Sequence, residues 1–230
     1  MKFMSFNTQH CLNYIERQID FEVMAKAIRD TGADIVGLNE MRGAGVDPEY
    51  TAQTEKLAEL TGLKYYAFAK AIDVPNGGPY GNAILSRYPI DEVTVTHVPD
   101  PAPKAGVTYE TRCLLKVRTG GFTVCVIHFG LDIDEQKNAV ATVLSCIEDE
   151  RCVLMGDFNV IPENPVLLPI RARMRDTAEL FPAPRLSFPS DAPRCKIDYI
   201  FASRDLHVLS ADIPAVVASD HRPHIAEIIE

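Results

Sequence analysis

The chain has 230 residues, of which 47% are hydrophobic and 24% charged, and its formal net charge is -9. This length fits one large domain or two small ones, and we expect a single domain spanning residues 1–230. An acidic chain disfavours tight, non-specific binding to long nucleic acid, which needs a basic surface. The acidic net charge is still compatible with a local basic pocket or with phosphate binding through a metal ion.

The sequence carries no targeting signal that we recognise. Met1-Lys2 leads directly into an expected strand, without the apolar region and cleavage site of a signal peptide. No apolar run approaches the length needed to span a bilayer. The six cysteines form no C-x-x-C pair. We therefore expect reduced thiols and a cytoplasmic protein, whereas the oligomeric state cannot be inferred.

Three segments have the apolar spacing of amphipathic helices. The first has Asp20 as its N-cap and Gly32 as its stop, with apolar residues at i, i+3, i+4 and i+7. The second is expected over residues 51–60, and the third begins near Asp134. Their apolar stripes should pack on sheets.

Ten segments are typical of strands, and no long linker or repeat separates them. These are residues 2–6, 34–39, 64–68, 82–86, 112–118, 122–128, 152–158, 196–201, 206–210 and 223–228. So many strands with few helices do not fit one Rossmann-type sheet. Two packed sheets with helices outside fit better.

Several apolar, strand-like runs end in a side chain that can bind a metal or a phosphate. They lead to Asn7, Glu40, His128 and Asp157. The apolar run 216–218, which we interpret as the end of another strand, leads to Ser219-Asp220-His221. Since sites in open α/β sheets lie where strands end, these residues predict one shared active site.

Each residue also has a structural interpretation. Asp157 and Asn159 point the same way if the strand continues through both, but Gly-Asp-Phe-Asn also suits an Asx turn. Glu40 alone could be a solvated loop residue, and His128 a hydrogen-bonded structural histidine. Asp198 lies inside an apolar strand and needs a partner, for which a histidine is an obvious choice.

Oxygen ligands predominate among the candidates. Glu40, Asp157 and Asp220 supply carboxylates, and Asn7 and Asn159 supply amides. No paired Cys/His cluster suggests zinc, whereas hard oxygen donors favour magnesium or manganese. Magnesium retains waters and combines naturally with substrate phosphates, which points to phosphoester chemistry.

Six motifs in order resemble the endonuclease/exonuclease/phosphatase superfamily, and they extend over residues 3 to 226. They are Ser5-Phe6-Asn7, Leu38-Asn39-Glu40, residues 81–87 (GNAILSR), Gly156-Asp157-Phe158-Asn159, residues 197–200 (IDYI) and Ser219-Asp220-His221. The resemblance implies a DNase I-like fold, a four-layer α/β sandwich of two packed mixed sheets flanked by helices. It also implies divalent-metal-dependent hydrolysis of phosphoesters.

The resemblance further implies a metal site and a water site. Glu40 would be the principal ligand of one or two Mg²⁺ or Mn²⁺ ions, with Asn7 and Asp220 beside it. Asp157 would orient or activate the attacking water, and Asn159 would hold the phosphate.

The other matched residues would contact the phosphate. His221 would touch the scissile group or act as a base, oriented by Asp198. His128 would be a second histidine on the phosphate. Tyr80 and Arg112, which match less closely, would line the pocket, with Arg112 supplying a fixed positive charge.

Three positions depart from the family pattern. Gln-Glu is usual where this chain has Asn39-Glu40, His224 stands where many relatives carry an apolar residue, and residues 194–196 keep part of the usual basic run. None of these changes removes a core catalytic residue, so we expect an active enzyme.

The substrate is left open between alternatives. The compact, acidic chain without Trp favours a small phosphorylated molecule, carrying a phosphomonoester or phosphodiester, over a nucleic acid. An endo- or exonuclease is the first alternative. A membrane lipid head group is another, although no insertion loop stands out. A catalytically silent binding module would be expected to have lost Glu40, Asp157 or His221.

Overall fold

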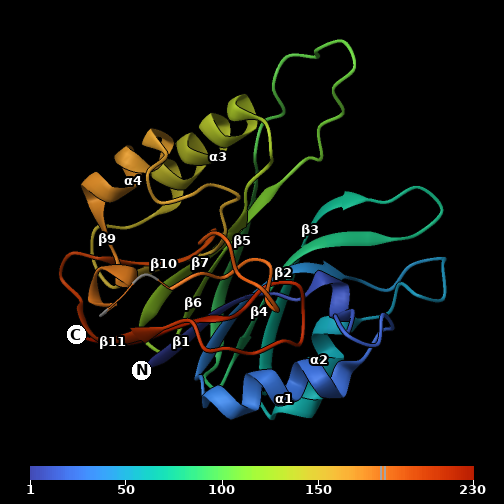
Figure 1. Cartoon of the computed structure of the whole chain (residues 1–230), viewed down its shortest axis with the longest axis horizontal. Helices are drawn as coiled ribbons and strands as arrows, with labels where there is room; N and C mark the ends of the chain where they lie inside the picture. Colours follow the sequence, from blue (N-terminus) through green and yellow to red (C-terminus); the bar gives the residue numbers. More distant parts are fainter. Residues whose placement is uncertain (182, 184) are drawn as a thin grey trace.

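Two six-stranded mixed sheets lie face to face in the computed structural model, which describes residues 1–181, 183 and 185–230 (Figure 1). The first sheet has the order β11-β12-β1-β2-β4-β3, with bounds His207–Asp212, His224–Ile229, Lys2–Asn7, Ile35–Arg42, Pro79–Ser86 and Tyr65–Asp73. The second has the order β5-β6-β7-β8-β10-β9, with bounds Ile90–His97, Cys113–Thr119, Phe122–His128, Cys152–Asp157, Asp198–Ser203 and Met174–Asp176.

Helices cover the outer face of each sheet (Figure 1). Helices α1 (Phe21–Thr31) and α2 (Gln53–Thr61) pack on the first sheet, and α3 (Ile133–Cys146) and α4 (Leu168–Arg173) on the second. Short 3-10 turns are η1 (Gln9–Cys11), η2 (Pro165–Leu167) and η3 (Thr177–Leu180). The predicted four-layer α/β sandwich is confirmed.

The predicted ends of α1 are confirmed in detail. The Asp20 side chain accepts a hydrogen bond from the backbone N–H of Val23 at 3.1 Å. Gly32 follows the helix with φ of 65°, a left-handed conformation that glycine adopts without steric cost. These local signals place the helix so that Met24, Ala25 and Ile28 are buried against the sheet.

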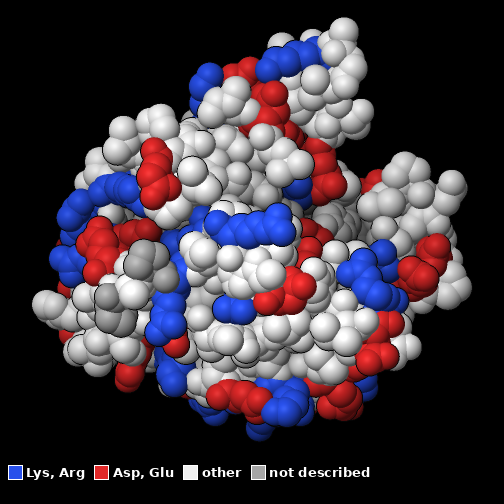
Figure 2. All heavy atoms as spheres, viewed as in Figure 1, with Lys and Arg blue, Asp and Glu red and all other residues white. Residues whose placement is uncertain are grey.

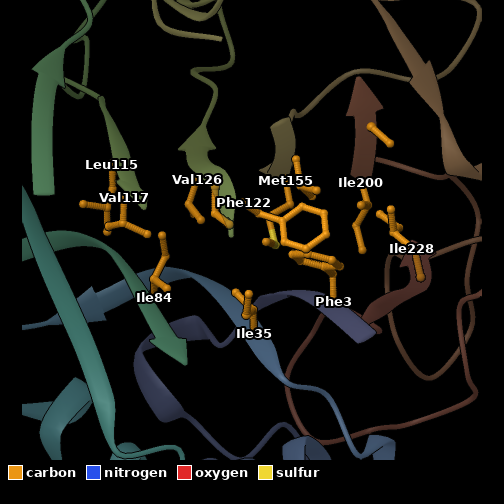
Figure 3. Close-up of a cluster of buried hydrophobic side chains, with 14 of the residues drawn as sticks. Phe3, Ile35, Ile84, Leu115, Val117, Phe122, Val126, Met155, Ile200 and Ile228 are labelled. Carbon is orange, nitrogen blue, oxygen red and sulfur yellow. The ribbon is translucent and has the colours of Figure 1, made fainter. Parts of the chain in front are cut away.

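The inner faces of the two sheets form one apolar core (Figure 3). Phe3 and Ile35 of the first sheet face Val126, Met155 and Ile200 of the second. The Phe3 and Phe122 rings meet edge to face at a centroid distance of 5.3 Å. Burying this apolar surface fixes the sheets against each other and hence the relative positions of their strand ends.

Three elements were not predicted: β5, β9 and α4. Strand β5 is an edge strand whose residues are mostly exposed, and its alternating, β-branched run Val93-Thr94-Val95-Thr96 was the signal available in the sequence. The opposite error concerns residues 216–218, which we interpreted as a strand and which lie in the irregular segment between β11 and β12. Among the described residues, no helix is both long and apolar enough to cross a bilayer.

Candidate active site

The topology brings the ends of four strands to one edge of the sandwich. Strands β1 and β2 are parallel and pair Asn7 with Asn39, and β7 and β8 are parallel and pair His128 with Asp157. Strand β10 starts at the same edge, where Asp198 pairs with Asp157 in antiparallel register. Polar residues from both sheets therefore meet at the end of the shared core.

A hydrogen-bonded bridge joins the two sheets at this edge. Asn7 Nδ2 donates to Glu40 Oε1 at 3.0 Å and to Asp157 Oδ2 at 3.1 Å. Glu40 lies in a bulge of β2 with φ of 60°, and this irregular backbone sets the direction of its side chain. Such strain in a residue other than glycine is typical of functional sites.

The Gly156-Asp157-Phe158-Asn159 motif combines a strand end with a turn. Strand β8 ends at Asp157, and Asp157 Oδ1 accepts a hydrogen bond from the Asn159 N–H at 2.9 Å. The predicted Asx turn is therefore present, and the alternative of a strand continuing through Asn159 is wrong. Asn159 Nδ2 donates to Phe129 O at 3.0 Å and lies 3.2 Å from His128 Nε2.

Asp198 and His221 form a buried pair next to Asp157. His221 Nδ1 lies 2.9 Å from Asp198 Oδ2, and its Nε2 lies 3.6 Å from Asp157 Oδ2. Burial alone would lower the pKa of His221, but the charges of Asp198 and Asp157 outweigh it and raise the pKa to about 10. The imidazole is therefore cationic at neutral pH. The histidine partner expected for Asp198 is confirmed.

The segment that carries His221 is a loop whose backbone is held by hydrogen bonds to Ser187 and Ser190. Ser190 Oγ donates to Ser219 O at 2.5 Å, and the Ser190 N–H donates to Asp220 O at 2.7 Å. The Arg222 N–H donates to Ser187 O at 2.7 Å. These bonds, rather than strand pairing, position Asp220 and His221 at the sheet edge.

His128 is buried and held as a neutral imidazole. Arg112 Nη1 lies 3.1 Å from His128 Nδ1, and since a guanidinium only donates, this nitrogen accepts and Nε2 carries the proton. Burial, together with the Arg112 charge, holds the pKa of His128 well below its usual range. His128 Nε2 lies 3.5 Å from Asp157 Oδ2.

Glu40 and Asp220 form an acidic group beside His221. Burial raises the pKa of Glu40, the hydrogen bond from Asn7 opposes this, the charge of Asp220 adds to it, and the charge of His221 lowers it. Tyr80 lies beside Glu40, and burial followed by the Glu40 charge raises the pKa of its hydroxyl. Within the described chain, neither Glu40 nor Asp220 forms a salt bridge. This all-oxygen donor set, whose carboxylates have no salt-bridge partner among the described residues, fits Mg²⁺ or Mn²⁺.

A second group of possible ligands is less suited to a metal. Atoms of Asp157, Asp198 and His221 lie within 4.8 Å of one another. However, His221 Nδ1 is already bonded to Asp198, and its positive charge opposes a second cation. The predicted metal ligands Asn7, Glu40 and Asp220 form a separate group of donors beside it.

The structure brings all ten predicted site residues to this one edge. Sequence reasoning missed the connecting roles of Asn39 and Asn82, which are buried amides inside apolar strands. Asn39 Nδ2 donates to Asn82 Oδ1 at 2.8 Å, and Asn82 Nδ2 donates to Cys113 O at 2.8 Å. A buried amide in a strand needs partners, and this was the signal available in the sequence.

The family model for the endonuclease/exonuclease/phosphatase family matches residues 4–221. The chain belongs to this family. Uncharacterized protein YbhP of Escherichia coli K12 is 28% identical over 250 residues, which cover 99% of this chain and 95% of YbhP. The predicted family membership is confirmed, and members of this family are hydrolases that act on phosphoester bonds.

Solved structures share the fold along the whole chain. An endonuclease/exonuclease/phosphatase from Beutenbergia cavernae has a TM-score of 0.78 at 22% identity, covering 99% of this chain and 71% of that one. The mannosyl-6-phosphatase Bt3783 of Bacteroides thetaiotaomicron has a TM-score of 0.76 at 16% identity, with both chains covered completely. At these identities the similarity shows the fold alone.

Proposed function

We propose that the protein is a divalent-metal-dependent phosphoesterase that hydrolyses a small phosphorylated molecule. The single observation that carries this proposal is that an acidic oxygen-donor group lies beside a buried, carboxylate-held histidine. On one side lies the acidic group of Glu40 and Asp220, and on the other the cationic His221 with its partner Asp198. Asp157 lies between them, bonded to the Asn7 bridge.

In this proposal Asp157 orients and deprotonates the attacking water. Burial raises the pKa of Asp157 to about 7, although the His221 charge opposes the increase. A carboxylate with such a pKa is better matched to accept a proton at neutral pH than an exposed aspartate. His221, protonated and fixed by Asp198, stabilises negative charge on the phosphate as the bond to water forms.

The remaining polar residues would hold the phosphate in line with the water. His128 offers its Nε2–H, Asn159 its amide, and Arg112 a fixed positive charge behind His128. Tyr80 would line the pocket beside Glu40. Preorganised donors of this kind stabilise charge that develops in the transition state.

Glu40, Asp220 and Asn7 would hold one or two Mg²⁺ or Mn²⁺ ions. The metal would act as a Lewis acid on the phosphoryl group and support the leaving oxygen. The fit rests on the oxygen-only donor set, in which neither Glu40 nor Asp220 has a salt-bridge partner among the described residues.

The preference for a small substrate rests on charge. The net charge is -9, and the face seen in Figure 2 mixes Lys and Arg with Asp and Glu. The name of the mannosyl-6-phosphatase among the structural neighbours makes a sugar phosphate a reasonable first substrate.

The test is hydrolysis of a substrate panel with Mg²⁺ or Mn²⁺ against EDTA. The panel holds a sugar phosphate, an aryl phosphomonoester, a bis-aryl phosphodiester, plasmid DNA and short RNA. We expect metal-dependent hydrolysis of a small ester, reduced at least about a hundredfold in Asp157→Ala and in His221→Ala.

Two results would contradict this proposal. Cleavage of DNA or RNA that disappears in Asp157→Ala, with small esters untouched, would identify a nuclease. Activity that persists in both folded variants would remove Asp157 and His221 from the mechanism.

A further inference from the structure

A cavity of about 640 Å³ opens beside the candidate active site, between η3 and the segment that leads into β10. Its lining includes Cys195 and Lys196, close in sequence to Asp198 of the catalytic pair. Figure 2 shows basic side chains (blue) gathered over the left part of the molecule, where Figure 1 places β9 and β10. The proposed hydrolytic mechanism does not use this cavity.

The less exposed part of the cavity carries an excess of positive charge. Lys196 Nζ and Arg171 Nη2 lie 3.5 Å and 3.6 Å from the same oxygen, Oδ2 of Asp176. Asp176 is thus the one carboxylate in direct contact with both cations; Asp198 also acts on Lys196, but it is paired with His221. The exposed rim adds two cations and two acids that offset each other: Arg185, Arg194, Glu163 and Glu179.

Two donors in this cluster are unsatisfied. Lys196 is 5% exposed, and in the described chain neither its Nζ nor the Nε of Arg171 has a hydrogen-bond partner. The ammonium lies 3.2 Å from the centre of the Tyr199 ring, which compensates only part of its lost hydration. Burial lowers the pKa of Lys196 to about 8, against the opposing charges of Asp176 and Asp198. A buried cation without hydrogen bonds is unfavourable unless a further anion joins it.

The cavity also has apolar walls, to which Ile161, Phe181 and Leu186 contribute. Ligand sites commonly combine such walls with a few convergent polar groups. We propose that this cavity binds a small organic anion, whose carboxylate or phosphate faces Lys196 and Arg171 while its apolar body packs against Phe181 and Leu186.

The test is isothermal titration calorimetry with three probes of the same aromatic body. They are 2-naphthoate, 2-naphthyl phosphate and the neutral 2-naphthamide, titrated in EDTA to prevent hydrolysis. We expect at least one anion to bind at least about tenfold more tightly than the amide, as one charge-assisted hydrogen bond supports. The preferred anion distinguishes carboxylate from phosphate as the recognised group.

Four variants locate the binding. Arg171→Met, in a half-buried side chain, and Lys196→Met should each weaken anion binding at least about tenfold without affecting the amide. Glu40→Gln and Asp157→Ala alter the candidate active site and should leave the anion affinity unchanged. Circular dichroism checks the fold of each variant. If Lys196→Met does not fold, the anion affinity of Arg171→Met alone decides whether the anion binds in this cavity.

Two outcomes would overturn the proposal. Equal affinities for the anions and the amide, including no binding at all, would show that the cavity does not select negative charge. Anion binding that is lost in Asp157→Ala but retained in Arg171→Met would place the anion in the active site instead.

Discussion

The side-chain oxygen of Asn39 accepts a hydrogen bond from the backbone N–H of Asp157, with an N-to-O distance of 2.9 Å. The Asn39 amide nitrogen donates to Ile127 O at 3.0 Å and to Asn82 Oδ1 at 2.8 Å. One buried amide thus connects β2 and β4 of the first sheet with β7 and β8 of the second. We infer that Asn39 is a positioning residue that fixes Asp157.

Asn39→Ala should lower both stability and turnover. The substitution leaves the Asp157 N–H, Ile127 O and Asn82 Oδ1 without a partner, which costs about 2–4 kcal/mol of unfolding free energy. Because Asp157 would lose its anchor, kcat should fall at least about tenfold with little change in KM. Urea unfolding and steady-state kinetics measure the two effects.

Ser86→Ala is the matched control for this prediction. The Ser86 hydroxyl lies 2.7 Å from Thr119 Oγ1 and joins the two sheets at the opposite end of β4. Its loss should reduce stability while kcat stays within about twofold, because this contact lies at the end of β4 far from the candidate active site. If kcat fell equally in Asn39→Ala and Ser86→Ala, Asn39 would act only on stability and would not position Asp157 for catalysis.

The pH dependence of kcat/KM should be bell-shaped. Asp157 must be ionised to accept a proton, and its pKa is raised, mainly by burial, to about 7, so activity should rise through that pH. His221 must keep its proton, and Asp198 and Asp157 overcome burial to raise its pKa to about 10, so activity should fall above that pH. A pH–rate profile of the metal-loaded enzyme measures both limbs.

Asp198→Asn should move the alkaline limb of this profile. Without the Asp198 carboxylate, the pKa of His221 falls, and the decline in activity should begin at least about one pH unit lower. Asp220→Asn, which contributes less to the His221 pKa, serves as the comparison. An alkaline limb that stays in place in Asp198→Asn would mean that another group controls it.

Magnesium should stabilise the protein through Glu40. At a concentration about a hundred times its Kd, Mg²⁺ would add about 2.7 kcal/mol and raise Tm by roughly 5–10 °C. Glu40→Gln should abolish this shift, whereas Glu49→Gln, on an exposed side chain paired with Arg42, should retain it.

Without metal, Glu40→Gln should melt at or above the Tm of the unmodified protein at pH 8. The folded state raises the pKa of Glu40, mainly by burial, so its ionised form costs stability at pH values above that pKa. Thermal melts in EDTA at pH 8 measure this, and a large decrease in Tm for Glu40→Gln would argue against an unbalanced acidic site.

Gly156→Ala should be severely destabilising. A Cβ at this position would lie 1.8 Å from Ile127 O, and φ is 151°, a conformation that other residues rarely adopt. We expect a loss of at least about 3 kcal/mol. Gly106→Ala, with a φ of 75° and nothing within 4 Å of the added Cβ, should cost only about 1 kcal/mol. Denaturant unfolding of both variants separates the steric clash from the backbone preference.

Short-range patterns were sufficient for much of the fold and for the identity of the site residues. Asp20 and Gly32 mark the ends of α1 because caps act within one helical turn. Strand β7 was predicted at its observed bounds because every one of its residues is buried, leaving an uninterrupted apolar run. Asp157 and His221 stood out because polar groups directly after apolar runs need partners or solvent.

Other features depend on contacts between residues far apart in the chain. Residues 216–218 resemble a strand, yet they lie in a loop held by Ser190, and an apolar run alone cannot specify its hydrogen-bonding neighbour. Strand β5 forms at an exposed sheet edge by pairing with β6, so burial in the core does not mark it. The bond from Asp157 to Asn39 spans 118 positions, so only the packing of two sheets on a common core could create it.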